Sequence, residues 1–173
     1  MKPALYRAIV IGALVLLLGA VNVNIWQREN LLHDGQTVLL DLAPVDPRSL
    51  MQGDYMALRF AVARNVQAAT ASRDTGADGY VVVKRDARNV GTFSRLYRDG
   101  EALAADESRI RYRQRKHDVR IVTNAWFFQE GTGSVYAPAR YGELRVADNG
   151  DALLTGMRDK ELNLLTAKPA RIE

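Results

Sequence analysis

The sequence has no cysteine and only two histidines among its 173 residues. Without cysteine there are no disulfide bonds, no thiolate zinc sites and no cysteine nucleophiles. His33 and His117 are too few for a histidine-based metal site. The sequence also has no strong excess of one charge, because 24 basic and 20 acidic residues give a net charge of +4. Two of the basic residues, Lys2 and Arg7, lie near the N-terminus. A charge this small argues against a nucleic-acid-binding protein.

Composition narrows the class of protein further. Hydrophobic residues make up 47% of the chain and charged residues 25%, with a mean hydropathy of −0.19. These values exclude a multi-pass membrane protein, and they exclude a disordered chain, which would be poorer in apolar residues. The length suits one domain with a short appendage.

One long apolar run, from Ala8 to Trp26, contains no charged residue. As a helix it would rise about 28 Å, close to the thickness of the hydrocarbon core of a bilayer. Tyr6 and Trp26 bracket the run, as aromatic residues do at membrane interfaces. Lys2 and Arg7 precede it, which predicts a cytoplasmic N-terminus and places the rest of the chain on the outer side of an inner (cytoplasmic) membrane, in a periplasm or its equivalent.

A cleaved signal peptide is the alternative interpretation of this run. Cleavage needs small residues at positions −3 and −1, but a cut after Ala20 puts Leu18 at −3, and a cut after Val21 puts valine at −1. We therefore predict an uncleaved single-pass anchor. The expected organisation is a cytoplasmic tip and signal-anchor helix over 1–26, a connector over 27–36 and an extracytoplasmic domain over 37–173.

The outer domain is expected to be mainly β, with an antiparallel sheet and one or two short helices. Apolar and β-branched runs predict strands over 37–42, 55–62, 79–85, 89–97, 109–115 and 119–128. The segment 125–128 is apolar on both faces, so we expect it to be buried. Asp148-Asn149-Gly150 predicts a hairpin that joins 143–147 to 151–155. Short helices are expected at 46–50 and within 134–141, and 159–165 is ambiguous.

Four arginines alternate along one predicted strand, so that Arg109, Arg111, Arg113 and Arg115 share one face while Ile110 lies on the other. Such a row would suit lipid headgroup phosphates or an acidic partner. The alternative is a solvated strand face, or an edge strand that its charges protect from aggregation. No aromatic residues interleave with the arginines on that face, which weakens a nucleic-acid interpretation.

The segment Gly53-Asp54-Tyr55-Met56-Ala57-Leu58-Arg59-Phe60 resembles the signature of the GDYXXLXY family, except that phenylalanine replaces the final tyrosine. The flanking segments 44–50 and 128–131 are also similar to those of the family. The resemblance implies a membrane-anchored bacterial protein of a family with no assigned activity. It also implies a connection with multi-pass membrane proteins, beside which members are often encoded.

In the signature, Tyr55 shares one strand face with Ala57 and Arg59, and the face with Met56, Leu58 and Phe60 is expected to enter the core. The signature is then a turn that leads into a core strand. A sharper hypothesis is a polar site that binds a ligand or partner, formed by Arg48, Asp54, Tyr55 and Glu130. For Glu130 the alternative is an exposed turn residue.

A weak similarity to membrane-anchored signal peptidases rests on Ser49, Gly53-Asp54 and Lys84. Such an enzyme uses a serine nucleophile and a neutral lysine base, which requires desolvation of Lys84. The sequence context of Ser49 differs from that family, and Lys84 lies in a charged run that favours solvent.

The sequence thus favours a binding or accessory module, not an enzyme, that works with an envelope or inner-membrane partner. The expected partners are the lipid bilayer and a multi-pass membrane protein. No cofactor or metal is predicted, because no phosphate loop or metal-ligand spacing is present. A tethered Ser/Lys hydrolase and a structural envelope protein are the alternatives.

Overall fold

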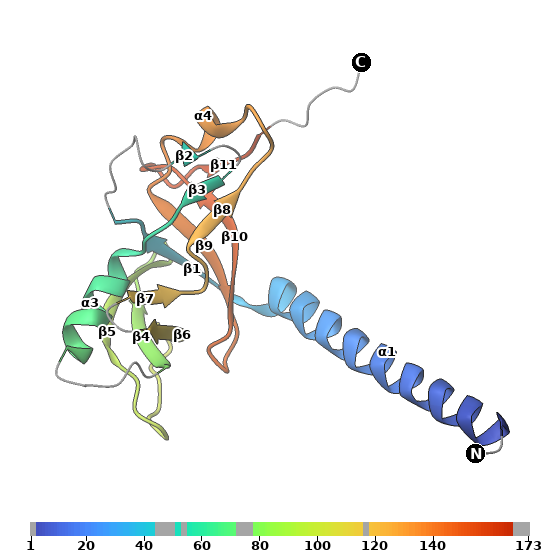
Figure 1. The fold of residues 1–173 in the computed structure, drawn as a ribbon. Coiled ribbons are helices and arrows are strands. Elements are labelled where there is room, and N and C mark those ends of the chain that lie inside the picture. Colours follow the sequence, from blue (N-terminus) through green and yellow to red (C-terminus); the bar gives the residue numbers. More distant parts are fainter. Residues whose placement is uncertain (1–2, 44–50, 53–54, 72–77, 116–117, 168–173) are drawn as a thin grey trace. The chain divides into compact units, whose positions relative to one another are not determined.

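A computed structural model describes residues 3–43, 51–52, 55–71, 78–115 and 118–167 (Figure 1). The contacts divide the chain into two units, residues 1–34 and residues 35–173.

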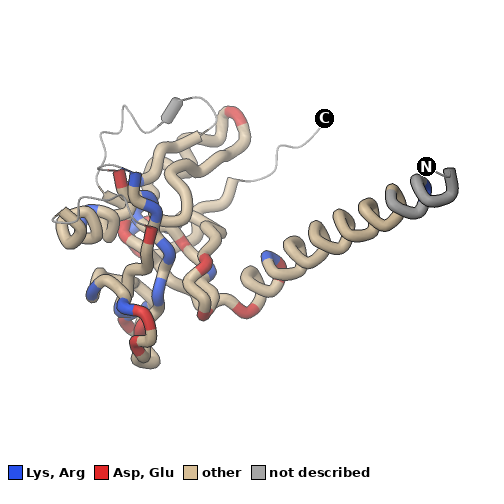
Figure 2. The backbone as a smooth tube through the Cα atoms, turned by 60° about the horizontal axis from the view of Figure 1, so that its bottom comes forward, with Lys and Arg blue, Asp and Glu red and all other residues tan. Residues whose placement is uncertain are grey.

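The first unit is one helix, α1 (Pro3–Asp34). Its portion Val10–Asp34 is long and apolar enough to cross a membrane, judged by length and composition, and the middle of the helix carries no charge (Figure 2). The helix extends beyond the predicted anchor, so that residues 27–34 of the expected connector are helical. Gln, Arg, Glu and Leu in this stretch are good helix formers, and Arg28 Nε donates to Asn24 Oδ1 one turn earlier, at 3.2 Å.

The second unit contains an eight-stranded sheet in the order β11-β10-β9-β1-β5-β4-β6-β7. Only the β1–β5 pair of this sheet is parallel, so the predicted β-rich and mainly antiparallel fold class is confirmed. The strands are β1 (Gln36–Asp41), β4 (Gly79–Arg85), β5 (Val90–Leu96), β6 (Glu107–Arg115), β7 (Asp118–Ile121), β9 (Tyr141–Val146), β10 (Ala152–Arg158) and β11 (Leu164–Leu165).

A smaller sheet has the order β2-β3-β8 and is antiparallel. Its strands are β2 (Met51–Gln52), β3 (Tyr55–Ala57) and β8 (Ala125–Phe127). Two helices complete the described part of this unit, α3 (Ala61–Thr70) and α4 (Gly133–Tyr136). The latter overlaps the short helix expected within 134–141 but begins one residue earlier, and the ambiguous segment 159–165 ends in β11. The helix expected at 46–50 lies outside the described residues.

The strand predicted over 55–62 is wrong in its second half, because β3 ends at Ala57 and α3 begins at Ala61. The reason is visible in the helix itself. Val62, Val66 and Thr70 recur every four residues and are all buried, so they form the buried stripe of a helix, and the β-branched Val62 alone falls within the predicted strand.

The long strand predicted over 119–128 is also wrong. The extended conformation is interrupted at Val122, whose φ is +57°. As a result β7 belongs to the large sheet and β8 to the small one. The burial expected for residues 125–128 is also wrong, because Phe127 is 74% exposed. The end of the segment pairs with a sheet that has a solvent-facing side, and not with a central strand covered on both faces.

The buried side chains form two clusters. The larger one lies between the large sheet and α3 and includes Val38, Val66, Val83, Ile110 and Leu144. The smaller one contains Met56, Leu58, Tyr136 and Met157, with Trp126 and Phe128 packed against it. The second unit therefore has a hydrophobic core under each sheet.

Candidate functional site

The signature segment connects the two cores. Its inward side chains are buried as predicted, with exposures of 3% for Met56, 5% for Leu58 and 2% for Phe60. The first two enter the smaller cluster, and Phe60 enters the larger one. Phe60 also forms an isolated antiparallel β-bridge with Leu42, the residue after β1, and directly precedes α3. The segment therefore fixes the small sheet to the large one.

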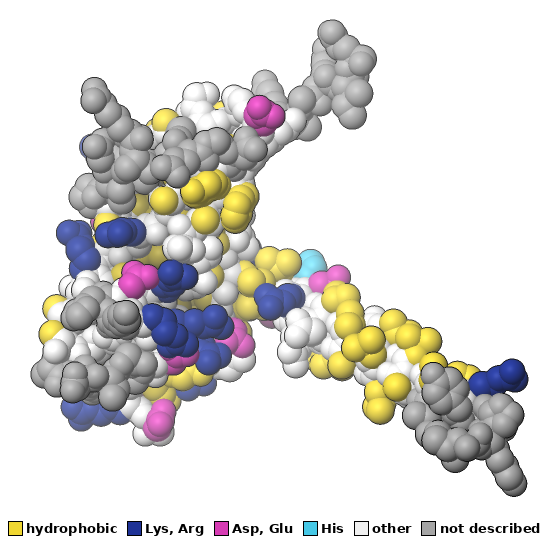
Figure 3. Space-filling model, viewed as in Figure 1, with side chains coloured by type: hydrophobic (Ala, Val, Ile, Leu, Met, Phe, Trp, Pro, Cys, Tyr) yellow, Lys and Arg dark blue, Asp and Glu magenta, His cyan; other side chains and the backbone are white. Residues whose placement is uncertain are grey.

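The outward face of the same segment carries an exposed aromatic pair. Tyr55 on β3 lies directly opposite Phe127 on β8, and their ring centroids are 5.8 Å apart. Tyr55 is 36% exposed and Phe127 is 74% exposed. Figure 3 shows hydrophobic side chains gathered over these two strands. We call these two side chains, together with Ala57 and Ala125 in the next pair on the same face, the aromatic face.

Of the four residues of the predicted polar site, the structure places two. Tyr55 lies on the aromatic face, and Glu130 is exposed in the turn after β8, beside Gly131 with a φ of +77°. Arg48 and Asp54 lie outside the described residues. Sequence reasoning did not select Phe127, because an apolar run of four residues indicates burial; its pairing with the signature tyrosine depends on register between distant segments.

The arginines of β6 alternate outward as predicted, while Ser108, Ile110, Tyr112 and Gln114 are buried between them. The strand pairs with β4 on one side and β7 on the other. In the strand order it lies between these two strands, with residues 107–112 paired to β4 and residues 112–115 paired to β7, so β6 is not the edge strand of the sheet. Arg111, Arg113 and Arg115 are exposed.

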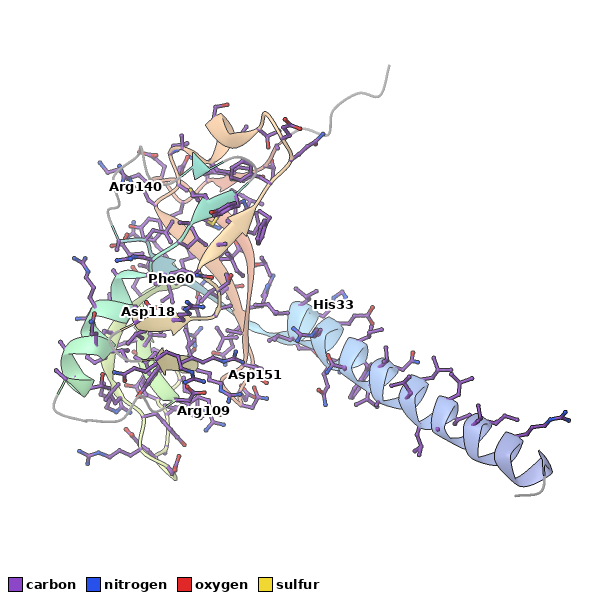
Figure 4. All side chains as sticks on the ribbon, viewed as in Figure 1. His33, Phe60, Arg109, Asp118, Arg140 and Asp151 are labelled. Atoms are coloured by element: carbon purple, nitrogen blue, oxygen red, sulfur yellow. The ribbon has the colours of Figure 1, made fainter. Side chains whose placement is uncertain are left out.

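Arg109 differs from the other three because it holds the tip of the β9–β10 hairpin. Its guanidinium carbon lies 5.4 Å from the ring centroid of Tyr80 and 5.1 Å from that of Tyr97. Its Nε donates to the carbonyl oxygen of Asp148 at 2.8 Å. Figure 4 shows Arg109 and Asp151 at the same end of the domain. Arg109 thus makes its contacts within the domain, whereas the side chains of the other three arginines on β6 are exposed.

A cavity of about 420 Å³ lies beside Arg109. Glu107, Glu101, Gln36 and Ser108 contribute polar groups to its lining. Both carboxylates hydrogen-bond to Arg95, and Ser108 Oγ donates to Gln36 Oε1 at 2.9 Å. The Arg95 hydrogen bonds and the backbone N–H of Ala104 lower the pKa of Glu107 to about 2. Because these polar groups hydrogen-bond to one another, they are better placed to stabilise the fold than to carry out acid–base chemistry.

Lys84, the base of the hydrolase alternative, is on the surface. Its side chain is 64% exposed, and its Nζ lies 3.5 Å from Asp106 Oδ2. A neutral lysine base needs the opposite surroundings, a desolvated amine without a carboxylate beside it. Ser49 lies outside the described residues. Within the part of the chain that the structure describes, no group of three His, Cys, Asp or Glu residues is placed to hold a metal ion.

Comparison with known protein families gives a match. The model of a family described as GDYXXLXY protein matches residues 17–157, most of the chain and all of the signature segment. Comparison with curated proteins found no match, and comparison with solved structures found none.

Proposed function

The chain belongs to the GDYXXLXY family, and we propose that it is a single-pass membrane-anchored binding protein whose β domain docks a membrane protein partner outside the cytoplasm. The apolar helix supports the anchor. Lys2 and Arg7 before it support an N-terminus in the cytoplasm. An anchored domain meets proteins of the same membrane at high local concentration, which favours partners of that class.

The aromatic face is the observation that carries the proposal. Tyr55 belongs to the family signature, yet its ring is directed outward beside the exposed Phe127 while its neighbour Met56 is buried. A folding role alone does not require an exposed aromatic pair. Aromatic residues supply large contact areas at little entropic cost, and they are enriched at the centres of protein interfaces.

Site-specific crosslinking in intact cells tests this docking surface. A photoreactive phenylalanine analogue replaces Phe127 in one variant and Tyr55 in a second, and a third carries it at the exposed Arg64 of α3 as the control. We expect the first two to form an adduct with the same membrane protein and the control to form none. Equal adducts at all three positions, or none at Phe127 and Tyr55, would contradict the proposal.

Tyr55→Phe separates docking from folding. We expect the variant to keep its thermal stability and to bind the crosslinked partner more weakly, because the exposed ring keeps its packing while the hydroxyl is lost. The measurement pairs thermal unfolding of the full-length protein in detergent with co-purification of the partner. A large loss of stability with unchanged partner binding would make Tyr55 a structural residue and remove it from the docking surface.

Topology is tested independently of the partner. A reporter that is active only outside the cytoplasm, fused after Glu173, should be active. The mature protein should keep its N-terminal segment. A mature chain that begins near Val21 or Asn22 would refute the anchor and leave a secreted domain.

A further inference from the structure

A second surface of the β domain carries unbalanced positive charge. We define the arginine face as the outward side chains of Arg111, Arg113 and Arg115 on β6 and Arg120 on β7, and all four are exposed. Figure 3 shows Lys and Arg side chains gathered over these two strands. Arg111 is paired with β4, and Arg113 and Arg115 are paired with β7, so a neighbouring strand fixes the spacing of each arginine position.

Acidic neighbours neutralise only part of this charge. Arg115 Nη1 lies 2.7 Å from Asp78 Oδ1, and this hydrogen bond keeps the pKa of Asp78 below its usual range. Arg120 Nε lies 3.0 Å from Asp118 Oδ2. Among the described residues, Arg111 and Arg113 have no ion pair within 4.0 Å. The face therefore has four guanidinium groups against these two carboxylates.

The register places two of these arginines directly opposite one another. Arg113 on β6 is the cross-strand partner of Arg120 on β7. Like charges at opposite positions destabilise a sheet, and such side chains start only about 5 Å apart at Cβ. An anion bound between the two guanidinium groups would remove this repulsion. Arginine suits phosphate because its planar fork can donate two hydrogen bonds to it.

We propose that the arginine face binds the anionic phospholipid headgroups of the membrane in which the protein is anchored. The phosphodiester is the chemistry that the opposed arginines fit. The chain's own apolar helix makes a bilayer the anionic surface closest at hand. The contact would orient the domain on the membrane through the large sheet, whereas the aromatic face belongs to the small sheet. The proposal does not depend on the partner docking described above.

Arginine footprinting of the full-length protein tests the proposal in a bilayer. The protein is placed in nanodiscs of phosphatidylcholine alone, or of phosphatidylcholine mixed with phosphatidylglycerol. Phenylglyoxal, which modifies accessible guanidinium groups, is then applied, and mass spectrometry gives the rate at each arginine. Arg64 on α3 and Arg140 before β9 are exposed internal controls. Figure 4 shows Arg140 at the opposite end of the domain from Arg109.

We expect phosphatidylglycerol to slow the modification of Arg113 and Arg120 by at least about fivefold, the factor that corresponds to roughly 1 kcal/mol for a basic residue at an anionic surface. The two controls should not change. Equal slowing at Arg64 and Arg140 would overturn the proposal, as would equal rates in both kinds of nanodisc. Inorganic phosphate added to discs of phosphatidylcholine alone should not protect; full protection by it would overturn the lipid assignment in favour of a soluble phosphate ligand.

A matched pair of variants provides a second readout. Arg113→Gln/Arg120→Gln should abolish the protection of Arg111 by phosphatidylglycerol, whereas Arg64→Gln/Arg140→Gln, with the same change in net charge, should preserve it. Unchanged protection of Arg111 in the first variant would overturn the proposal. If that variant fails to fold, the footprint of the unaltered protein still decides.

Discussion

Arg109 Nε donates a hydrogen bond to the carbonyl oxygen of Asp148, at 2.8 Å, from a strand 39 positions earlier in the chain. The backbone N–H of Arg111 donates to Gly150 O at 2.9 Å, so β6 holds the same hairpin turn twice. Gly150 suits this contact because its φ is +90° and a Cβ there would lie 2.7 Å from the ring of Tyr80. The turn is thus shaped to fit beneath the arginine that Tyr80 and Tyr97 flank.

Arg109→Ala should destabilise the protein by about 2 kcal/mol, since it removes a hydrogen bond from a charged donor as well as two cation–π contacts. Arg111→Ala is the control, because its exposed side chain forms no ion pair among the described residues. It should change stability by less than about 0.5 kcal/mol. Chemical denaturation of the full-length protein in detergent measures both. Equal losses of stability in the two variants would show that the contacts of Arg109 with the hairpin and the two tyrosines do not stabilise the protein.

Leu58→Ala should cost about 2–5 kcal/mol, because Leu58 is 5% exposed in the smaller core and the truncation leaves a cavity. The matched change is Leu164→Ala on β11, where the leucine is 49% exposed. That variant should lose less than about 1 kcal/mol. The same denaturation experiment compares them, and a small loss for Leu58→Ala would mean that the signature does not support the core.

Gly142→Ala should destabilise by about 1–3 kcal/mol through overpacking. A Cβ at this position would lie 2.8 Å from Cε1 of Phe60 and 3.1 Å from Cδ1 of Leu154. Adding Phe60→Leu should recover part of the loss, because the smaller side chain makes room for the methyl group. A double-mutant cycle measures this coupling. Strictly additive losses would contradict a contact between the signature and β9.

Val122→Gly should stabilise the protein by up to about 1 kcal/mol. Valine in the left-handed region costs about 1–2 kcal/mol, and the entropic cost of glycine is about 0.5–1 kcal/mol. Little burial is lost, because Val122 is 36% exposed. Val119→Gly, within β7, should instead destabilise. The two midpoints in a thermal melt should therefore move in opposite directions, and a fall for Val122→Gly would contradict the backbone strain.

Stability should decline in acid through Glu107. Its folded pKa is about 2, below its ordinary value of 4.5, because the charged carboxylate is bound by Arg95. The stabilisation from this ion pair is therefore complete above about pH 4.5 and is lost as the pH falls towards 2. Glu107→Gln should be less stable at neutral pH and should flatten the stability profile across that window. If Glu107→Gln lost stability between pH 4.5 and 2 as steeply as the unaltered protein, the decline would be due to other carboxylates.

Several features follow from the sequence because they depend on local periodicity. The uncharged run from Ala8 to Trp26 specifies a helix that can span a membrane wherever the rest of the chain lies. Strict alternation along β6 and within the signature separates the buried side chains from the exposed ones, since successive residues of a strand face opposite ways. Asn149-Gly150 specifies its hairpin by backbone preference alone.

Long-range register decided the rest. Residues 119–128 look like one buried strand, but Val122 turns the chain into a second sheet, and only pairing with β3 exposes Phe127 beside Tyr55. Arg109 is equivalent to Arg113 in the local pattern. It differs because two tyrosines and a distant hairpin meet it, whereas Arg113 meets another arginine across the strand. Alternation along a strand determines which side chains share a face, but the opposing partner comes from a distant segment that only the folded chain brings into register.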